Sequence, residues 1–338
     1  MIKRFYILAL VVTLILAGCG GSVGQSAGLA DISTAPAIST ATAFPPTTVP
    51  PPSPTATLPP ASPSPTVTPA PTATITPVPV IHFAVIGDYG SGKQAEADVA
   101  GLVDSWGVDF IITTGDNNYP DGSPETIDEN IGQFYQAYIA PYKGEFGAGA
   151  EQNRFFPTLG NHDWNINRAQ AYLDYFTLPG NERYYDFIWG PVHFFALDSD
   201  SREPDGMNRS STQAAWLQAQ LASSTSPWKV VYLHHAPYSS GYHGSTDWAQ
   251  WPFKEWGADA VLAGHDHVYE RLLVDDLVYF VNGVGGDVIY PFLIIQDVSQ
   301  FRYNDDYGAM RVEASPMYMT FQFINRSGDL IDAYTLER

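Results

Sequence analysis

The sequence predicts an α/β domain over residues 80–338, preceded by two segments that cannot form a core. Short apolar runs of strand length alternate with amphipathic stretches from Val80 onward. The last part of the chain is rich in runs that are typical of strands. Glycine or metal-binding side chains directly follow several of the apolar runs, at the place where open α/β sheets bind their ligands.

Buried strands are predicted wherever such a run ends in glycine or a polar residue. These runs cover residues 80–86, 109–114, 155–159, 230–233 and 260–263. Between the first two, Lys93–Trp106 predicts an amphipathic helix. Its expected inner residues are Ala97, Val99, Leu102 and Val103. Residues 277–280, 311–314 and 317–324 predict antiparallel strands, with a hairpin turn at 325–328.

Residues 1–19 predict a lipoprotein signal peptide. Lys3 and Arg4 precede the apolar run Phe5–Ala17, which suits a signal-peptide core and is short for a membrane span. The following Leu16-Ala17-Gly18-Cys19 resembles a bacterial lipobox, and Cys19 is the only cysteine of the chain. We therefore expect cleavage before Cys19, lipidation of Cys19, and a domain anchored to the bacterial cell membrane on its extracytoplasmic side. A plain cleaved signal and an uncleaved anchor are the alternatives.

Residues 20–79 predict a disordered stalk. They are mostly Pro, Thr, Ser and Ala, and Asp31 is their only charged residue. Because they lack an apolar period, they cannot bury enough surface to offset the entropy of ordering. Proline-rich runs such as 49–54 favour extended polyproline II. A processed pro-segment is the alternative interpretation.

Charge and cysteine content limit the function of the domain. Of 16 basic and 36 acidic residues in the chain, only Lys3, Arg4 and Asp31 precede residue 80, so 14 basic and 35 acidic residues remain, a net charge of −21. This charge argues against nucleic acid as a partner and repels phosphate at long range. Since residues 80–338 contain no cysteine, their metal ligands can only be oxygen and nitrogen donors.

Five short motifs contain the candidate ligands. Alone, a Gly-Asp pair is usually a turn or a helix cap, and a lone histidine often fills a core. Together the motifs supply carboxylates, a tyrosine, an amide and imidazoles, which suit two neighbouring metal ions, a device for in-line attack on phosphorus. The motifs are Gly87-Asp88-Tyr89-Gly90, Gly115-Asp116-Asn117-Asn118-Tyr119, Gly160-Asn161-His162-Asp163, His234-His235 and Gly264-His265-Asp266-His267.

In this order the motifs resemble those of the calcineurin-like metallophosphoesterases. Residues 115–119 resemble the second motif of the purple acid phosphatases, which ends in a metal-binding tyrosine. The resemblance spans about Ile81 to Arg271 and is closest to the small tartrate-resistant type. It implies a four-layer sandwich of two mixed β-sheets flanked by helices, with a dinuclear metal centre at the carboxyl ends of strands.

The resemblance also implies which residues bind the metals. Asp88, Tyr119 and His267 would hold an iron(III) ion. Asn161, His234 and His265 would hold a divalent ion, which is iron(II), zinc(II) or manganese(II), and Asp116 would bridge the two ions. Simple packing of Tyr119 beside Pro120 is the alternative, and it would leave a generic centre with two divalent ions.

The fourth motif departs from the family pattern. Relatives usually have one residue between the ligand histidine and a proline, whereas two residues separate His234 from Pro237. Alignment on Tyr238-Ser239 makes His234 the ligand, and alignment on Pro237 makes it His235. We favour His234, because it also gives His243 the spacing that the tartrate-resistant type has.

The activity implied by the resemblance is hydrolysis of phosphate monoesters, in which the metals lower the pKa of a bound water that attacks phosphorus. The leaving alkoxide then needs a proton, and His162 and His243 are the candidate catalytic residues. His162 follows Asn161, and His243-Gly244 lies nine residues after His234, as does a substrate-side His-Gly in the tartrate-resistant type. A structural role for His162 and a solvated loop position for His243 are the alternatives.

Two other functions fit the same residues. A phosphodiesterase or nucleotide hydrolase would use the same dinuclear site on another phosphate ester. A surface binding module with an inactive site is the third hypothesis, and the complete ligand set argues against it. Arg154, Arg168 and Arg183 are candidate cations for phosphate, although solvated surface charge is the favoured interpretation of each. Tyr269-Glu270-Arg271 is interpreted as structural.

Overall fold

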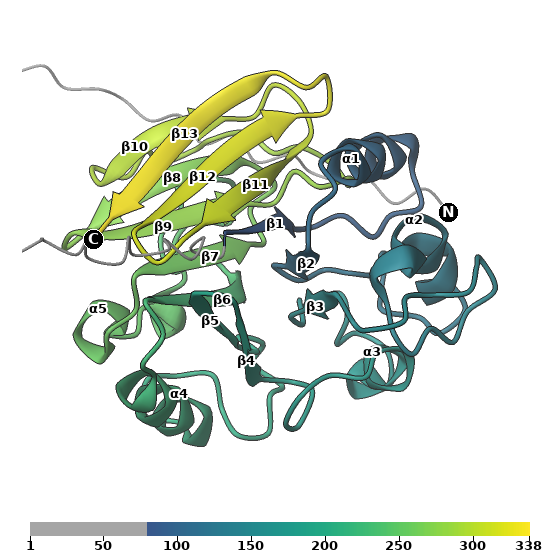
Figure 1. Cartoon of the computed structure of the whole chain (residues 1–338), viewed down its shortest axis with the longest axis horizontal. Helices are drawn as coiled ribbons and strands as arrows, with labels where there is room; N and C mark the ends of the chain where they lie inside the picture. Colours follow the sequence, from purple (N-terminus) through teal and green to yellow (C-terminus); the bar gives the residue numbers. More distant parts are fainter. Residues whose placement is uncertain (1–79) are drawn as a thin grey trace, which may run out of the picture. The chain divides into compact units, whose positions relative to one another are not determined.

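A computed structural model describes residues 80–338, which form two mixed β-sheets flanked by helices (Figure 1). The predicted α/β sandwich is therefore confirmed. The predicted signal peptide with Cys19 and the predicted stalk at 20–79 lie outside the described residues. None of the helices within residues 80–338 is both long enough and apolar enough to cross a membrane.

The sheets have six and seven strands, in the orders β13-β12-β11-β1-β2-β3 and β10-β8-β9-β7-β6-β5-β4. Strands β1, β2 and β3 run parallel, as do β5, β6, β7 and β9. The other pairs are antiparallel. The strands are β1 (Ile81–Ile86), β2 (Phe110–Thr113), β3 (Phe155–Pro157), β4 (Tyr185–Trp189), β5 (Val192–Ala196), β6 (Trp228–His235), β7 (Ala260–Gly264), β8 (Tyr269–Val274), β9 (Leu277–Asn282), β10 (Ser299–Tyr303), β11 (Gly308–Ala314), β12 (Tyr318–Asn325) and β13 (Leu330–Glu337).

The helices are short, and long loops connect many of the strands. The α-helices are α1 (Gln94–Ser105), α2 (Gln133–Tyr135), α3 (Gln170–Tyr175), α4 (Thr212–Ser223) and α5 (Phe253–Trp256). A π-helical turn, η1 (Asp128–Gly132), precedes α2. Single 3₁₀ turns are η2 (Gln136–Tyr138), η3 (Asn167–Ala169) and η4 (Asp247–Ala249).

Every apolar run that predicted a strand overlaps one, and the predicted hairpin joins β12 to β13. The sequence reasoning missed β4, β5, β8 and β10. The predicted helix is α1, with Lys93 and Trp106 as its caps. Val99 and Val103 are buried as predicted, but Ala97 and Leu102 are partly exposed. Glu96 turns inward instead, because its carboxylate accepts hydrogen bonds from two backbone N–H groups of the preceding loop.

Strand β6 shows how the sheets build the core. Val230 and Tyr232 face the cluster that also contains residues of β1 and β2 in the other sheet. Val231 and Leu233 face a second cluster, which includes residues of α4 and α5. This alternation is the period of two that a strand with both faces covered requires. The strand then ends in His234 and His235, next to the other sheet.

Candidate metal centre

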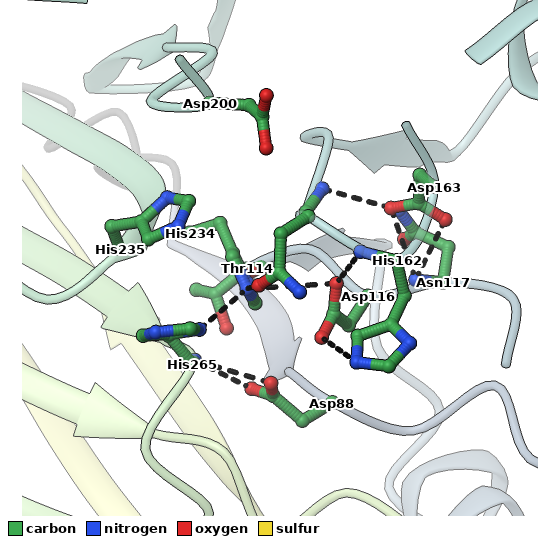
Figure 2. Close-up of polar contacts among 12 residues, drawn as sticks. Asp88, Thr114, Asp116, Asn117, His162, Asp163, Asp200, His234, His235 and His265 are labelled. Carbon is green, nitrogen blue, oxygen red and sulfur yellow. Dashed lines mark hydrogen bonds and ion pairs between the residues drawn. The ribbon is translucent and has the colours of Figure 1, made fainter. Parts of the chain in front are cut away.

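The ends of five strands, from both sheets, meet at one place. In the six-stranded sheet, Asp88 follows β1, Asp116 and Tyr119 follow β2, and Asn161 and His162 follow β3. In the seven-stranded sheet, His234 and His235 end β6, and His265 and His267 follow β7. Figure 2 shows Asp88, Asp116, His162, His234 and His265 directed toward one common region. The structure thus brings together all seven predicted ligands.

One donor set is rich in oxygen. Ligand atoms of Asp88, Asp116 and His267 all lie within 4.8 Å of one another. The Tyr119 hydroxyl joins them, at 3.0 Å from Asp116 Oδ2, 3.1 Å from His267 Nε2 and 3.5 Å from Asp88 Oδ1. All four side chains are buried. Carboxylate and phenol oxygens are the donors that hard cations prefer.

A second donor set is rich in nitrogen. Ring nitrogens of His234, His235 and His265 lie within 4.8 Å of one another. His234 Nε2 lies 2.9 Å from Asn161 Oδ1 and 3.2 Å from His265 Nδ1. The same Nε2 lies 3.5 Å from Asp116 Oδ1. Asp116 therefore reaches both sets, with Oδ2 next to Tyr119 and Oδ1 next to His234. Of the two histidines that end β6, His234 is the one that contacts Asn161 and Asp116.

Backbone oxygens fix the orientation of three histidine rings. Nδ1 of His234 donates to the Thr114 carbonyl at 2.9 Å, and Nδ1 of His267 donates to the Val288 carbonyl at 2.6 Å. Nδ1 of His162 donates to a carbonyl as well, that of Pro120. Because a carbonyl only accepts, each Nδ1 carries a hydrogen, and Nε2 of the neutral ring has a lone pair to offer. Histidines that bind metals usually have this arrangement.

Burial dominates the electrostatics of the oxygen-rich set. It raises the pKa of Asp88, although His267 acts in the opposite direction. It would also raise the pKa of Asp116, but His234 and His162 outweigh it and hold that pKa below its usual value. Burial, Asp116 and Asp88 raise the pKa of the Tyr119 phenol well above 10. Buried acids face one another here with no lysine or arginine in either donor set, which fits a cation bound between them.

Burial also governs two rings of the nitrogen-rich set. It lowers the pKa of His235 to about 3, helped by the neighbouring His234. It lowers the pKa of His265 well below the usual value, again with His234 adding to the effect. Both rings are therefore neutral around pH 7, which is the form that binds metals.

Both candidate catalytic histidines line the cavity of about 100 Å³ at the donor sets. His162 Nε2 lies 3.9 Å from Asp116 Oδ2. The His243 ring stacks on His265 with ring centres 4.2 Å apart. His162 also lines a neighbouring cavity of about 360 Å³, together with Ser91, Lys93 and Val288. The residues that line the smaller cavity are Asp116, Asn161, His162, His243, His265, His267 and Tyr290.

Sequence reasoning missed a further strand end at the site. Strand β5 leads into Ser199, whose Oγ lies 2.9 Å from His235 Nδ1. Next along the chain, Asp200 forms an ion pair with Arg202 at 2.7 Å, and Arg202 Nη2 donates to the Asn161 carbonyl at 2.8 Å. The sequence did contain a signal for this strand end, because residues 192–197 are apolar except for His193 and lead to Asp198.

Three more residues support the site without having been predicted. Asp163 accepts hydrogen bonds from the N–H of Gly160 at 2.8 Å and from the Asn117 side chain at 2.8 Å, so it holds the third motif against the second. Asp266 accepts from the N–H of His243 at 2.7 Å and orders the loop that carries this histidine. Tyr290 stacks on His267 with ring centres 4.2 Å apart.

The other residues singled out from the sequence lie elsewhere. Arg154 donates to the backbone carbonyls of Asp109 and Ala137, and Arg183 pairs with Glu203 and Asp205. Neither of them lines the cavity at the donor sets, and neither does the exposed Arg168.

The segment 269–271 has the contacts of a structural element. Tyr269 and Arg271 both bond to Asp332, which joins β8 to β13 of the other sheet. Glu270 is buried and accepts hydrogen bonds from the N–H and hydroxyl of Ser240.

Comparisons with known proteins agree with the fold. A model of the calcineurin-like phosphoesterase family matches residues 81–269, more than half of the chain. Purple acid phosphatase 17 of Arabidopsis thaliana is 28% identical over 302 residues, which are 76% of this chain and 85% of that protein. Tartrate-resistant acid phosphatase type 5 of Mus musculus is 24% identical over 306 residues, 77% of this chain and 91% of that protein.

Two solved structures show the same fold. A purple acid phosphatase from yellow lupin seeds superposes with a TM-score of 0.63 at 18% identity, over 78% of this chain and 54% of that one. The chain thus spans about half the length of the lupin protein. GAP50, the anchor in the inner membrane complex of Plasmodium, superposes with a TM-score of 0.62 at 20% identity, over 76% of this chain and 89% of that one.

The matched sequence and the two-sheet fold define the class as phosphoric ester hydrolases. The chain belongs to the calcineurin-like phosphoesterase family, and purple and tartrate-resistant acid phosphatases are among its relatives at modest identity.

Proposed function

We propose that this chain is a dinuclear metal-dependent phosphomonoesterase of the purple acid phosphatase type. The observation that carries the proposal is the position of Asp116, which lies between an oxygen-rich and a nitrogen-rich donor set and reaches each with a different carboxylate oxygen. A carboxylate in this position can be shared by two cations. The names of the relatives, which are acid phosphatases, support monoesters as the substrates.

In this proposal Asp88, Tyr119 and His267 would hold iron(III), while Asn161, His234 and His265 would hold iron(II), zinc(II) or manganese(II). Asp116 would be shared by both ions. The donor chemistry supports this division, because a phenolate suits a hard trivalent ion and imidazoles suit a divalent one. When bound, the ions would neutralise phosphate oxygens and activate water for attack on phosphorus.

His162 is the proposed proton donor to the leaving group. The Pro120 carbonyl engages its Nδ1, so a proton that is to be transferred sits on Nε2. The ring lines both the cavity at the donor sets and the larger cavity beside it. A phosphoryl group in the first cavity and an organic group in the second would place the ester oxygen near His162. His243, which stacks on His265 and lines the same small cavity, is proposed to orient the phosphoryl group.

The visible absorption spectrum of the oxidised full-length protein tests the metal assignment. We expect a broad band from charge transfer between the Tyr119 phenolate and iron(III), and we expect Tyr119→Phe to remove it. Tyr290→Phe is the matched control, because Tyr290 also contacts His267 but is not a proposed ligand, and the band should persist in it. A colourless wild-type protein that binds metal and is active would contradict a role for Tyr119 in binding iron.

A substrate panel tests the preference for monoesters. We expect an aryl phosphate monoester to be hydrolysed with a higher kcat/KM than the matching diester, and both activities to fall in Asp116→Asn. A higher kcat/KM for the diester or for nucleoside triphosphates would instead assign the chain to the phosphodiesterase or nucleotide hydrolase alternative. A protein that binds metal and has no activity on the whole panel would favour the binding-module hypothesis.

We also propose that the protein is exported and anchored to the bacterial cell membrane by lipid on Cys19. The lipobox-like Leu16-Ala17-Gly18-Cys19 after a signal-peptide core supports this proposal. Mass spectrometry of the mature amino terminus should find an acylated Cys19, and Cys19→Ser should release activity from the membrane fraction. An unmodified cysteine at that position would contradict it.

A further inference from the structure

We infer that His235 is a further metal ligand, which adds a third imidazole to the nitrogen-rich site formed by His234 and His265. The inference rests on the proposed function, since it requires a metal at that site. The resemblance offers His235 only as an alternative to His234, whereas the inference is that both histidines bind the metal.

A β-bulge explains how two successive residues reach the same site. Neighbouring residues of a strand point to opposite faces, so His235 would be expected on the Leu233 face, toward α4 and α5. The register between β6 and β7 shifts, however: Tyr232 pairs with Leu262 and His235 with Gly264, so β6 has one residue more than β7 in this interval. An extra residue of this kind redirects the side chains that follow it.

The rings show the result of the bulge. The His235 ring centre lies 4.5 Å from that of His265 and 5.0 Å from that of His234. Ring nitrogens of the three residues lie within 4.8 Å of one another. The departure of the fourth motif from the family pattern, two residues instead of one between His234 and Pro237, lies directly beside this bulge.

The Nδ1 atom of His235 lies beside a protein oxygen, as do those of three other site histidines. His234, His267 and His162 each donate Nδ1–H to a protein oxygen, and His235 Nδ1 lies 2.9 Å from Ser199 Oγ. Ser199 Oγ also accepts the backbone N–H of His235 at 2.9 Å, so the same hydroxyl contacts both the backbone and the ring of this residue.

Nε2 is therefore the nitrogen left for a metal. Within residues 80–338 it makes no protein hydrogen bond, although the residue is only 8% exposed. A buried imidazole with one nitrogen held and the other without a protein partner, beside two further imidazoles, has the surroundings of a ligand. Three imidazoles in one set favour zinc over manganese as the divalent ion.

A ¹¹³Cd NMR experiment on the full-length wild-type protein tests the inference without any substitution. The metal-free protein, labelled with ¹⁵N-histidine, is loaded with ¹¹³Cd²⁺, and ring protons that couple to each cadmium identify its histidine ligands. We expect His235, His234 and His265 to couple to one cadmium and His267 to the other. Two bound cadmium ions without coupling to His235 would overturn the inference and leave the proposed function intact. Failure to bind cadmium would contradict the proposed function itself.

Metal affinity provides a second readout that does not depend on catalysis. His235→Ala should weaken Zn²⁺ binding at one of the two sites by about tenfold or more, as measured by competition with a chelator. His193→Ala is the control, because His193 is a buried histidine of the same sheet that bonds to Asp186 and Ser224, and its Zn²⁺ affinity should stay within about twofold of wild type. An unchanged Zn²⁺ affinity in His235→Ala, with a changed KM or kcat, would mean that His235 contacts substrate, and it would overturn the inference.

Discussion

Asp88, Asp116 and His265 have backbone φ angles of 53°, 51° and 70°, in the left-handed region that residues other than glycine rarely adopt. Such a residue costs about 1–3 kcal/mol, and it persists only where its surroundings enforce it. Here the N–H of His265 donates to both carboxylate oxygens of Asp88, at 3.1 and 3.0 Å. The left-handed conformation turns the chain sharply after each strand. The side chain therefore enters the site instead of continuing along the sheet.

The two candidate catalytic histidines differ in how they are held. His162 is fixed by the Pro120 carbonyl and packs against the Tyr119 ring, with ring centres 4.5 Å apart. His243 is exposed and lies in a loop that Asp266 orders through the backbone N–H groups of His243 and Gly244. A fixed ring that lines both cavities suits proton transfer to a leaving group, and an exposed stacked ring suits contact with the phosphoryl group.

We therefore predict that His162→Ala lowers kcat by about 10²- to 10⁴-fold with little change in metal content, because the leaving alkoxide would lack its proton donor. His243→Ala should raise KM more than it lowers kcat. His82→Ala is the control, since His82 on β1 pairs with Glu313 on β11 and lies outside the cavity at the donor sets. Steady-state kinetics with metal analysis decide the matter, and a wild-type kcat in His162→Ala would exclude the proposed role.

At the scale of elements, close packing between motifs explains why a glycine precedes the ligand in two of them. A Cβ atom at Gly160 would overlap the Asp116 carboxylate, and one at Gly264 would overlap that of Asp88. Each of these glycines thus leaves room for the ligand of another motif. These two motifs fit against the others because each contributes a polar side chain and a position without one.

Helix α1 begins with an unusual interaction that involves Glu96. Its Oε2 accepts the N–H groups of Ser91 at 2.8 Å and Gly92 at 2.7 Å, while its Oε1 is buried without a hydrogen-bond partner within residues 80–338. Burial raises the pKa of Glu96 well above 4.5, against the effect of these two backbone bonds. A protonated carboxyl, with its hydrogen on Oε1, satisfies this environment better than a carboxylate.

Glu96→Gln should therefore stabilise the protein increasingly as the pH rises. Because the pKa is higher in the folded state, the stability linked to this proton is fully present below about pH 4.5 and is lost as the pH rises through the folded-state value. Each unit of pKa difference corresponds to about 1.4 kcal/mol, and glutamine has no proton to lose. The difference in Tm between variant and wild type should grow from pH 5 to pH 8. Exposed Glu129→Gln is the control, and a difference that does not depend on pH would refute this account.

Strands and ligand positions of this fold were predictable where neighbouring residues of the sequence determine them. The run 80–86 followed by Gly87-Asp88 predicts both a strand and the position of its ligand, because strand polarity places that ligand at the carboxyl edge of the sheet. The direction of His235 was not predictable, since it depends on a register shift between β6 and β7. The role of Arg202 was not predictable either, because it depends on the folded chain: its contact with the Asn161 carbonyl joins segments 41 residues apart.

At the scale of the whole domain, the candidate centre joins the two sheets. Asp88, Asp116, Tyr119 and Asn161 extend from strands of the six-stranded sheet, and His234, His265 and His267 extend from the seven-stranded sheet. Elsewhere the sheets are linked by the core cluster and by bonds such as Arg271 to Asp332, at 2.8 Å. Metals bound between the donor sets would tie both sheets together, and they would also neutralise acids buried in a domain that already has a net charge of −21.

Removal of metal should accordingly lower the Tm of the entire domain in one cooperative step. Ligands that bind only the folded state stabilise it by about 4 kcal/mol at a thousand times their Kd. For a domain of 150–250 residues each kcal/mol corresponds to roughly 2–4 °C, so we expect a fall of about 8–16 °C that Zn²⁺ reverses. Differential scanning calorimetry of the full-length protein, metal-free and reconstituted, measures this effect.

The Tm of Asp116→Asn should respond much less to Zn²⁺, because the residue that reaches both donor sets would have lost its charge. Asp332→Ala is the matched control: it should lower Tm through the lost link between β8 and β13 while leaving the response to Zn²⁺ intact. Equal Tm values for the metal-free and reconstituted wild-type protein would show that the two sheets hold together without the metals.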